Sequence, residues 1–308
     1  MKALVYTGPH SLSYRDEVDP VAGNDEVIVK VEAVGICGSD MHAYHGFDER
    51  RPPPLILGHE AAGRVMTGPK AGRRVTVNPL VTCGTCEDCL DGRAHLCRSR
   101  QILSMAPRPG AFAELVRVPE GNIVDVPDGF DVVKAALAEP VAVSYHAVNV
   151  GVPALRRPVS AARCAVLGGG AIGLACALVL AMQGAGEILV GETNPARRKT
   201  AAKSGPFKVH APGEAGAPAD SSIDLVIDAV GADATRATAC RLVKPGGVIF
   251  RHDYGSARGP TLFWNKISSE LPVRHLEGTT LLCLRVSTQE IYDKMQRMLT
   301  SGRFSSAR

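Results

Sequence analysis

Four cysteines in one short stretch are the residues of this chain best suited to binding a metal ion: Cys83, Cys86, Cys89 and Cys97. Their spacing, C-x2-C-x2-C-x7-C, lets four thiolates converge on one tetrahedral zinc ion. Such a site has no open coordination position, so its predicted role is structural. Free thiols or disulfides are the alternative, but the turn-forming Gly84, Asp88 and Gly92 favour a closed metal site.

A second set of metal-type residues lies upstream, where Cys37 precedes the pair His59 and Glu60. Three protein ligands with an open fourth position make a catalytic zinc site. Taken singly, Cys37 could be a buried thiol, His59 a core histidine and Glu60 a surface carboxylate. The zinc hypothesis therefore depends on their belonging together.

A glycine fingerprint, Gly168-x-Gly170-x-x-Gly173, is predicted to bind a dinucleotide. It follows a strand-like run and opens a helix-like run, which is the context this motif requires. The glycines permit the turn, the approach of a pyrophosphate and close packing of helix on strand. Ile172 lies inside this motif, and the helix N-terminus offers free N–H groups to phosphates.

The acidic residue Glu192 follows the next predicted strand. A carboxylate there can accept hydrogen bonds from a ribose diol and would repel a 2′-phosphate. We therefore predict NAD(H) as cofactor. NADP(H) stays open as an alternative, because Arg197 and Arg198 follow closely.

The elements that must hold these residues change in type along the chain. Up to about residue 130, short strands separated by Gly, Pro and Asn predict a barrel or sandwich: residues 3–6, 26–33, 73–77, 112–118 and 123–126. From about Ala161, strands at 165–167, 187–190, 223–229 and 248–250 alternate with helices at 171–182, after Asn194, and at 232–243, which Gly246 is expected to end. This alternation predicts a parallel sheet with crossover helices.

Composition excludes some classes of protein. The net charge of +4 over 308 residues is small and argues against a nucleic-acid binder, and 45% hydrophobic residues suffice for packed cores. Nine cysteines without a secretory leader indicate a reducing, cytoplasmic location. The uncharged stretch from Cys164 to Gly186 is rich in glycine, so we expect a buried strand, turn and helix rather than a membrane span.

These motifs together resemble the zinc-containing medium-chain dehydrogenases of the alcohol dehydrogenase superfamily, in the polyol (sorbitol) and threonine dehydrogenase branch. The resemblance runs from the N-terminus to about residue 280. It rests on residues 35–40 (GICGSD), residues 58–63 (GHEAAG), the cysteine tetrad, residues 138–140 (AEP), the glycine fingerprint and residues 244–247 (KPGG).

The resemblance implies an α/β protein with a GroES-like β-barrel catalytic domain and a Rossmann dinucleotide-binding domain, a doubly wound parallel sheet, with the active site between them. It implies zinc ligands Cys37, His59 and Glu60, with Glu139 able to ligate or approach the metal. Asp40 would support His59. Ser39 and His42 would relay the substrate proton to solvent.

The implied domains are a catalytic domain over 1–140, with a structural zinc lobe at 83–97, and a nucleotide-binding domain over 141–280. A shortened C-terminal part, 281–308, would return to the catalytic domain with a helix at Ser287–Thr300. A homodimer or homotetramer is implied as well, with two zinc ions per chain and with no nucleic-acid or membrane partner.

The expected function is oxidation of a secondary alcohol in a polyol, sugar acid or hydroxy compound to a ketone with NAD⁺. Glu139 stands where simple alcohol dehydrogenases have a second cysteine, which favours the polyol side. The alternatives are a zinc dehydrogenase for simple alcohols or threonine, and a shortened homologue that binds zinc or dinucleotide without turnover.

Overall fold

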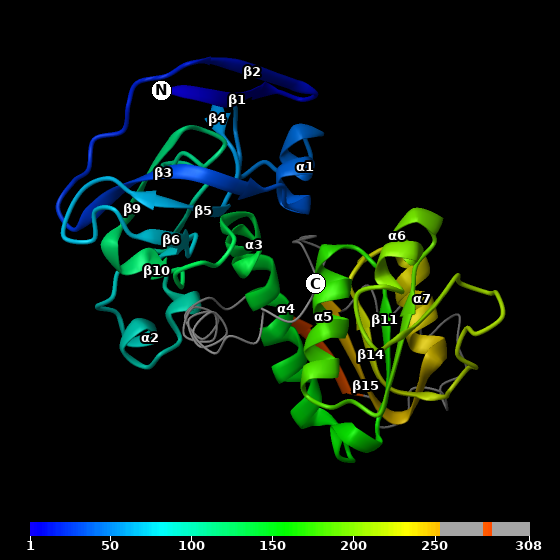
Figure 1. Ribbon diagram of the computed structural model, residues 1–308. Coiled ribbons are helices and arrows are strands. Elements are labelled where there is room, and N and C mark those ends of the chain that lie inside the picture. The colour runs from blue at the N-terminus through cyan, green and yellow to red at the C-terminus, as the bar shows by residue number, and fades with distance from the viewer. Residues whose placement is uncertain (253–279, 285–308) are drawn as a thin grey trace. The chain divides into compact units, whose positions relative to one another are not determined.

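The computed structural model describes residues 1–252 and 280–284, and the chain forms two compact units that divide between Ala142 and Val143 (Figure 1). The division falls inside helix α4 (Ala138–Gly151). The predicted helix at 287–300 lies outside the described residues.

The first unit contains short antiparallel strands, as the strand pattern predicts. Its main sheet has the order β10-β6-β5-β3-β9, and two smaller sheets have the orders β2-β1-β4 and β7-β8. The strands are β1 (Lys2–Gly8), β2 (Ser11–Asp16), β3 (Glu26–Gly35), β4 (Leu55–Ile56), β5 (Glu60–Val65), β6 (Arg74–Val77), β7 (Leu80–Val81), β8 (Gln101–Ile102), β9 (Leu115–Pro119) and β10 (Ile123–Asp125).

Valines of the main sheet dominate the core of this unit. Val29, Val75 and Val77 are fully buried and pack with Leu103 and Ile123. Three short helices lie between the strands: α1 (Gly38–Tyr44), α2 (Glu87–Leu90) and α3 (Val132–Ala136). The residues of the second metal-type set lie at the starts of helix α1 and strand β5, so this core positions them.

The second unit is built on one parallel sheet of six strands, in the order β13-β12-β11-β14-β15-β16. The strands are β11 (Arg163–Leu167), β12 (Glu187–Gly191), β13 (Lys208–His210), β14 (Ile223–Asp228), β15 (Val243–His252) and β16 (Thr280–Leu284). This is the doubly wound order in which ligands bind where the strand order reverses, between β11 and β14. Strand β16 extends the sheet past the predicted boundary at residue 280.

Helices cover both faces of the parallel sheet (Figure 1). Helices α4 and α5 (Ala171–Met182) bury residues such as Val148 and Leu180 against one face, and α7 (Asp233–Leu242) buries Ala239 and Cys240 against the other. Helix α6 (Pro195–Ala201) begins as predicted, since the Asn194 side chain accepts hydrogen bonds from the N–H groups of Ala196 and Arg197.

One prediction in this unit is wrong. Helix α7 ends at Leu242 without help from Gly246, because Val243 already begins strand β15. Gly246 lies within that strand at φ +73, a conformation that glycine adopts without strain. The pairing of β15 with β14 shifts register near its start, so the glycine belongs to an irregular strand.

The stretch from Cys164 to Gly186 folds as strand β11, the glycine turn and helix α5. Among the helices of residues 1–252, none has the length and apolar run that a membrane span requires.

Candidate functional site

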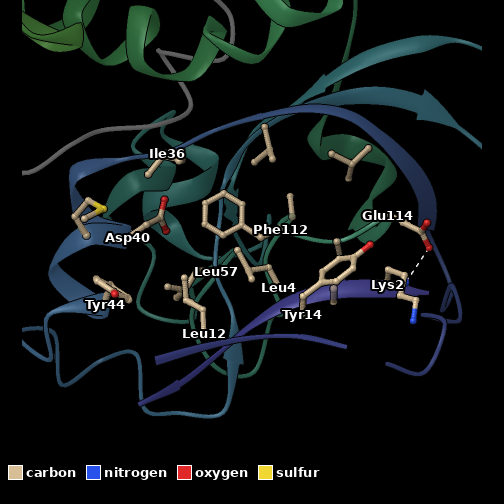
Figure 2. Close-up of a pocket in the computed structure, with 16 residues that line it drawn as sticks. Lys2, Leu4, Leu12, Tyr14, Ile36, Asp40, Tyr44, Leu57, Phe112 and Glu114 are labelled. Atoms are coloured by element: carbon tan, nitrogen blue, oxygen red, sulfur yellow. Dashed lines mark hydrogen bonds between the residues drawn. The ribbon is translucent and has the colours of Figure 1, made fainter. Parts of the chain in front are cut away.

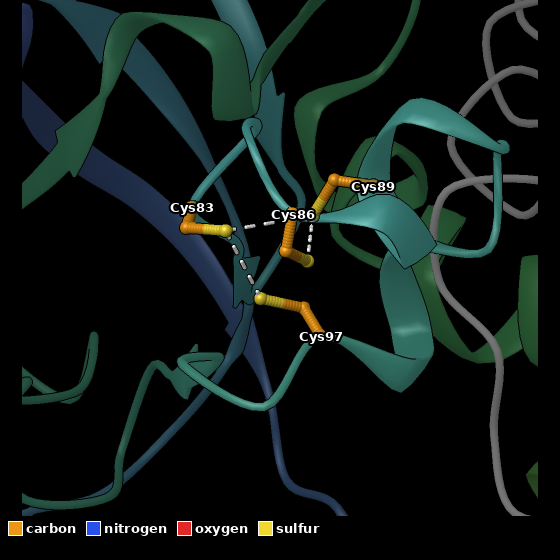
Figure 3. A group of neighbouring side chains, drawn as sticks. All are labelled: Cys83, Cys86, Cys89 and Cys97. Carbon is orange, nitrogen blue, oxygen red and sulfur yellow. Dashed lines mark hydrogen bonds between the residues drawn. The ribbon is translucent and has the colours of Figure 1, made fainter.

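The four cysteines of the tetrad come together on one small lobe (Figure 3). The Sγ–Sγ distances are 3.4 Å for Cys86 and Cys89, 3.6 Å for Cys97 and Cys83, and 3.9 Å for Cys83 and Cys89. Tetrahedral zinc with Zn–S bonds of about 2.3 Å needs sulfurs about 3.8 Å apart. All four sulfurs lie within 4.8 Å of one another, which is close to the spacing that a tetrahedral zinc ion needs.

Local backbone conformation brings these sulfurs inward. Gly84 at φ +72 and Gly92 at φ +75 make the turns on either side of α2, as predicted. The prediction for Asp88 is wrong, because this residue lies within helix α2. The N–H groups of Thr85 and Cys86 hydrogen-bond to the Cys83 sulfur and lower the pKa of Cys83 to about 6. A thiolate, the form that binds zinc, is favoured there.

The second set also converges. Ligand atoms of Cys37, His59 and Glu60 all lie within 4.8 Å of one another, and all three residues are buried. Cys37 is the N-cap of α1, while His59 immediately precedes β5 and Glu60 begins it. Gly35 pairs with Glu60 across β3 and β5, and a Cβ at Gly35 would collide with the Glu60 carboxylate. A glycine is required there to leave room for this carboxylate.

Burial and neighbouring side chains shift the pKa values of two residues in this cluster. Burial works against the charged form of His59, yet Asp40 and Cys37 raise the pKa of His59 well above its usual value. Burial raises the pKa of Glu60. A cysteine sulfur, a carboxylate oxygen and an imidazole nitrogen gathered in one buried place are the donor types of a zinc site.

Asp40 lies beside His59, as expected. Its Oδ1 is 3.6 Å from His59 Nδ1, and its two oxygens accept hydrogen bonds from the N–H groups of Cys37 (3.0 Å) and Gly58 (3.2 Å). Burial opposes the charge, but His59 and these N–H groups hold the pKa of Asp40 below its usual value.

Sequence reasoning missed Ser104, whose Oγ is 3.3 Å from His59 Nδ1. This serine is fully buried and has φ +68, in the left-handed region. No local pattern marks it, because its contact with His59 spans 45 positions of the chain.

Three further predicted residues lie on helices α1 and α4. Glu139 is in the first turn of α4, outside the group of three donors, and burial together with the charges of Glu60 and Asp40 raises the pKa of Glu139 to about 7. Ser39 is buried in α1, and His42 is exposed on the same helix. The two residues are three positions apart, so they share a face of this helix.

A cavity of about 600 Å³ lies beside α1, and Met41 and Tyr44 of that helix are among its lining residues (Figure 2). Leu4, Leu57 and Phe112 line it with mostly apolar neighbours, and Asp40 is also among its lining residues. None of the three clustered donors is among its lining residues, so we do not assign this cavity to their chemistry.

The glycine fingerprint has the geometry that a pyrophosphate needs. Gly168 has φ +98, and a Cβ at Gly173 would collide with the Gly168 carbonyl oxygen. A Cβ at Gly170, the N-cap of α5, would meet nothing within 4 Å. Space beside the free N–H groups of this helix start is therefore open to a phosphate. Ile172 packs partly against the core, where its carbonyl oxygen accepts a hydrogen bond from Ser144.

Glu192 follows β12 and reaches back to this turn. Its Oε2 accepts a hydrogen bond from Gly169 N–H at 2.8 Å, and its Oε1 accepts one from Asn194 N–H at 2.7 Å. Burial opposes the charge, but these two N–H groups hold the pKa of Glu192 below its usual value. A buried, ionised carboxylate thus lies next to the fingerprint.

The two neighbouring arginines differ. The Arg198 guanidinium donates to the carbonyl oxygens of Glu192 (2.9 Å) and Thr193 (2.6 Å), which fixes it to the backbone. Arg197 is exposed at the start of α6. Of the two, Arg197 is the side chain free to turn toward a ligand.

Comparison with known proteins agrees with this picture. Residues 23–128 match the family model of the alcohol dehydrogenase GroES-like domain. L-galactonate-5-dehydrogenase of Escherichia coli (strain K12) is 31% identical over 99% of this chain and 89% of its own length. Sorbitol dehydrogenase of Bacillus subtilis (strain 168) is 36% identical over 67% of this chain, and the match spans 59% of that relative.

A solved structure is similar over both units. A candidate zinc-binding dehydrogenase from Sinorhizobium meliloti 1021, bound to NADP, matches with a TM-score of 0.79 and 27% identity, covering 98% of this chain and 88% of that one.

Proposed function

Because the chain belongs to the zinc-containing medium-chain dehydrogenases of the alcohol dehydrogenase superfamily, we propose that it oxidises a secondary hydroxyl group of a polyol, sugar acid or similar hydroxy compound to a ketone with NAD⁺. One observation carries this proposal: the buried cluster of Cys37, His59 and Glu60 offers three donors, one fewer than zinc binds. Three protein ligands leave a position for a substrate oxygen.

Two zinc ions per chain follow from the two donor sets. Cys37, His59 and Glu60 would hold the catalytic ion, with Glu139 close by, and the tetrad would hold a structural one. The catalytic ion supplies a Lewis acid that favours loss of the hydroxyl proton, and the nicotinamide ring accepts the hydride.

The protein's own groups handle the proton. The buried Ser39 Oγ can accept it inside the site, and the exposed His42 imidazole, on the same helix, can hold it at the solvent boundary. Asp40 and Ser104 both contact His59 Nδ1, which keeps its ring orientation and leaves Nε2 for the metal.

A carboxylate-rich donor set favours polyhydroxy substrates over simple alcohols. Glu60 and Glu139 can hydrogen-bond a second hydroxyl next to the reacting one, and a site built for such a group rejects analogues that lack it. The relatives named galactonate and sorbitol dehydrogenase fit this substrate class.

The test is a comparison of kcat/KM with NAD⁺ for a hexitol, a sugar acid, a vicinal diol, threonine and ethanol. We expect a polyol or sugar acid to be at least about tenfold better than ethanol. A preference for ethanol would instead assign the chain to simple alcohols. No turnover of any substrate by protein with two zinc ions would favour a homologue that binds without catalysis.

Glu192 is expected to set the preference for NAD⁺. Its buried negative charge opposes a 2′-phosphate, and Glu192→Gln removes only that charge. This substitution should lower the ratio of kcat/KM with NAD⁺ to kcat/KM with NADP⁺ by about tenfold or more. The measurement is that ratio with one substrate for the wild type and the variant.

Glu187→Gln is the matched control for this cofactor test, since Glu187 begins the same strand and pairs with Arg163 and Lys208. It should leave the ratio unchanged. If the wild type prefers NADP⁺, the exposed Arg197 decides the selectivity and our assignment of Glu192 is wrong.

Two further features complete the proposal, the compartment and the assembly. Exposed and half-buried thiols in the tetrad suit a reducing compartment such as the cytoplasm. A homodimer or homotetramer is the expected assembly, and light scattering of the purified protein measures it.

A further inference from the structure

Arg51 is a buried arginine close to the proposed proton path. Only 3% of its surface is exposed. Its guanidinium donates from Nε to the Ser104 carbonyl oxygen (3.0 Å) and from Nη2 to Ser39 Oγ (3.3 Å). Nη1 donates to the Ser39 carbonyl oxygen (3.3 Å) and pairs with Asp48 Oδ2 (2.6 Å). Arginine is seldom buried this fully unless its donors have defined partners.

These contacts join the two serines that adjoin the catalytic cluster. Ser39 is held at both its carbonyl oxygen and its hydroxyl, and it belongs to α1, which Cys37 begins. Ser104 is held at its carbonyl oxygen, while its hydroxyl contacts His59. A single rigid guanidinium thus connects α1 with the segment that orients the histidine.

Electrostatic need alone does not account for Arg51. The exposed Arg50 already pairs with Asp48 through both carboxylate oxygens, at 2.7 and 2.9 Å. Burial opposes the charged form, but Arg50 and Arg51 keep the pKa of Asp48 below its usual value. Asp48 would therefore keep a cationic partner without Arg51, whereas Ser39 Oγ would lose a donor.

We propose that Arg51 is a positioning residue for proton transfer, acting through the Ser39 hydroxyl; this inference rests on the proposed dehydrogenase function. The bond from Nη2 occupies one lone pair of Ser39 Oγ and leaves the other lone pair and the hydroxyl hydrogen for the substrate and the relay. Because the guanidinium is planar and anchored at three further atoms, this hydroxyl keeps one orientation.

The experiment is a double-mutant cycle. Arg51→Met and Arg51→Lys are each made in the wild type and in Ser39→Ala, with Arg50→Met as the matched control because it contacts the same Asp48 and neither serine. Zinc content, thermal midpoint and KM for NAD⁺ accompany kcat/KM for the best alcohol. The solvent deuterium isotope effect on kcat reports the proton step.

Both Arg51 variants should lower kcat/KM by about 10- to 100-fold in the wild-type background and raise the solvent isotope effect. In the Ser39→Ala background, the same Arg51 substitutions should lower kcat/KM by less than about a further threefold, because the hydroxyl that Arg51 positions is absent. Zinc content and KM for NAD⁺ should stay as in the wild type, and Arg50→Met should change kcat/KM by less than about twofold.

Equal losses in both backgrounds, or loss of zinc from the Arg51 variants, would overturn the positioning role. Arg51→Lys keeps a positive charge beside Asp48 but removes the planar guanidinium. This variant therefore tests the positioning role if Arg51→Met does not fold. A wild type without turnover would instead refute the proposed function itself, and the two failures are therefore distinguishable.

Discussion

Cys37→Ser should lower kcat/KM by at least about a thousandfold while the protein stays folded. The Lewis acid of a zinc dehydrogenase contributes several kcal/mol to stabilising the developing charge, and each ~1.4 kcal/mol is a factor of ten in rate. A serine hydroxyl replaces a thiolate ligand poorly, so the ion should be lost from the cluster of Cys37, His59 and Glu60.

The fold should survive because of where Cys37 lies. It is the N-cap of α1, and its N–H donates to Asp40 Oδ2 at 3.0 Å. Serine is among the preferred N-cap residues, so α1 should keep its start. Metal analysis should fall from two zinc ions per chain to one, with the thermal midpoint within a few degrees of the wild type. An unchanged zinc content with activity within tenfold of wild type would remove Cys37 from the site.

Local patterns explain the parts of this site that sequence could predict. The cysteine tetrad and the glycine fingerprint are short motifs whose residue types and turns leave few alternatives. Helix α5 was predicted over its whole length, because glycine precedes an apolar run that no charge interrupts. In each case neighbours along the chain are also neighbours in space.

Contacts between distant segments explain the rest. Strand β5, EAAGRV, has a single β-branched residue and gave no strand signal, yet it is central in its sheet. Its Gly63 allows an approach to the Lys30 carbonyl oxygen that a Cβ would block. Pairing with β3 on one side and β6 on the other reveals this strand.

Buried polar partners are equally invisible in sequence. Arg51 lies 53 positions from Ser104 and Glu192 lies 23 positions from Gly169, so neither hydrogen bond follows from periodicity or spacing. Glu192 was predicted as a partner of the cofactor ribose. In the structure the same carboxylate also accepts a hydrogen bond from the glycine turn, at Gly169 N–H. The charge of Glu192 alone does not indicate this contact.

Cys86→Ser should remove zinc from the tetrad and lower the thermal midpoint by about 10 °C, with the catalytic zinc retained. Apart from two-residue β7 and β8 and short turns, the stretch from Asn78 to Ser104 contains just the short helices α2 and Ala94–Leu96. The tetrad residues are mostly exposed or half-buried, and Cys97 alone is buried. With so little core of its own, this lobe depends on the metal for its conformation.

The readouts separate this site from the catalytic one. Zinc should fall from two to one per chain in Cys86→Ser as in Cys37→Ser, but the midpoint should drop only in the former. The remaining tetrad thiols should react rapidly with a thiol reagent in Cys86→Ser, because thiolates released from zinc are accessible. Cys240→Ala is the control: burial raises the pKa of Cys240 to about 11, and its loss should leave both ions in place. A Cys86→Ser protein with two zinc ions, or with the midpoint of the wild type, would mean that the tetrad is not a structural zinc site.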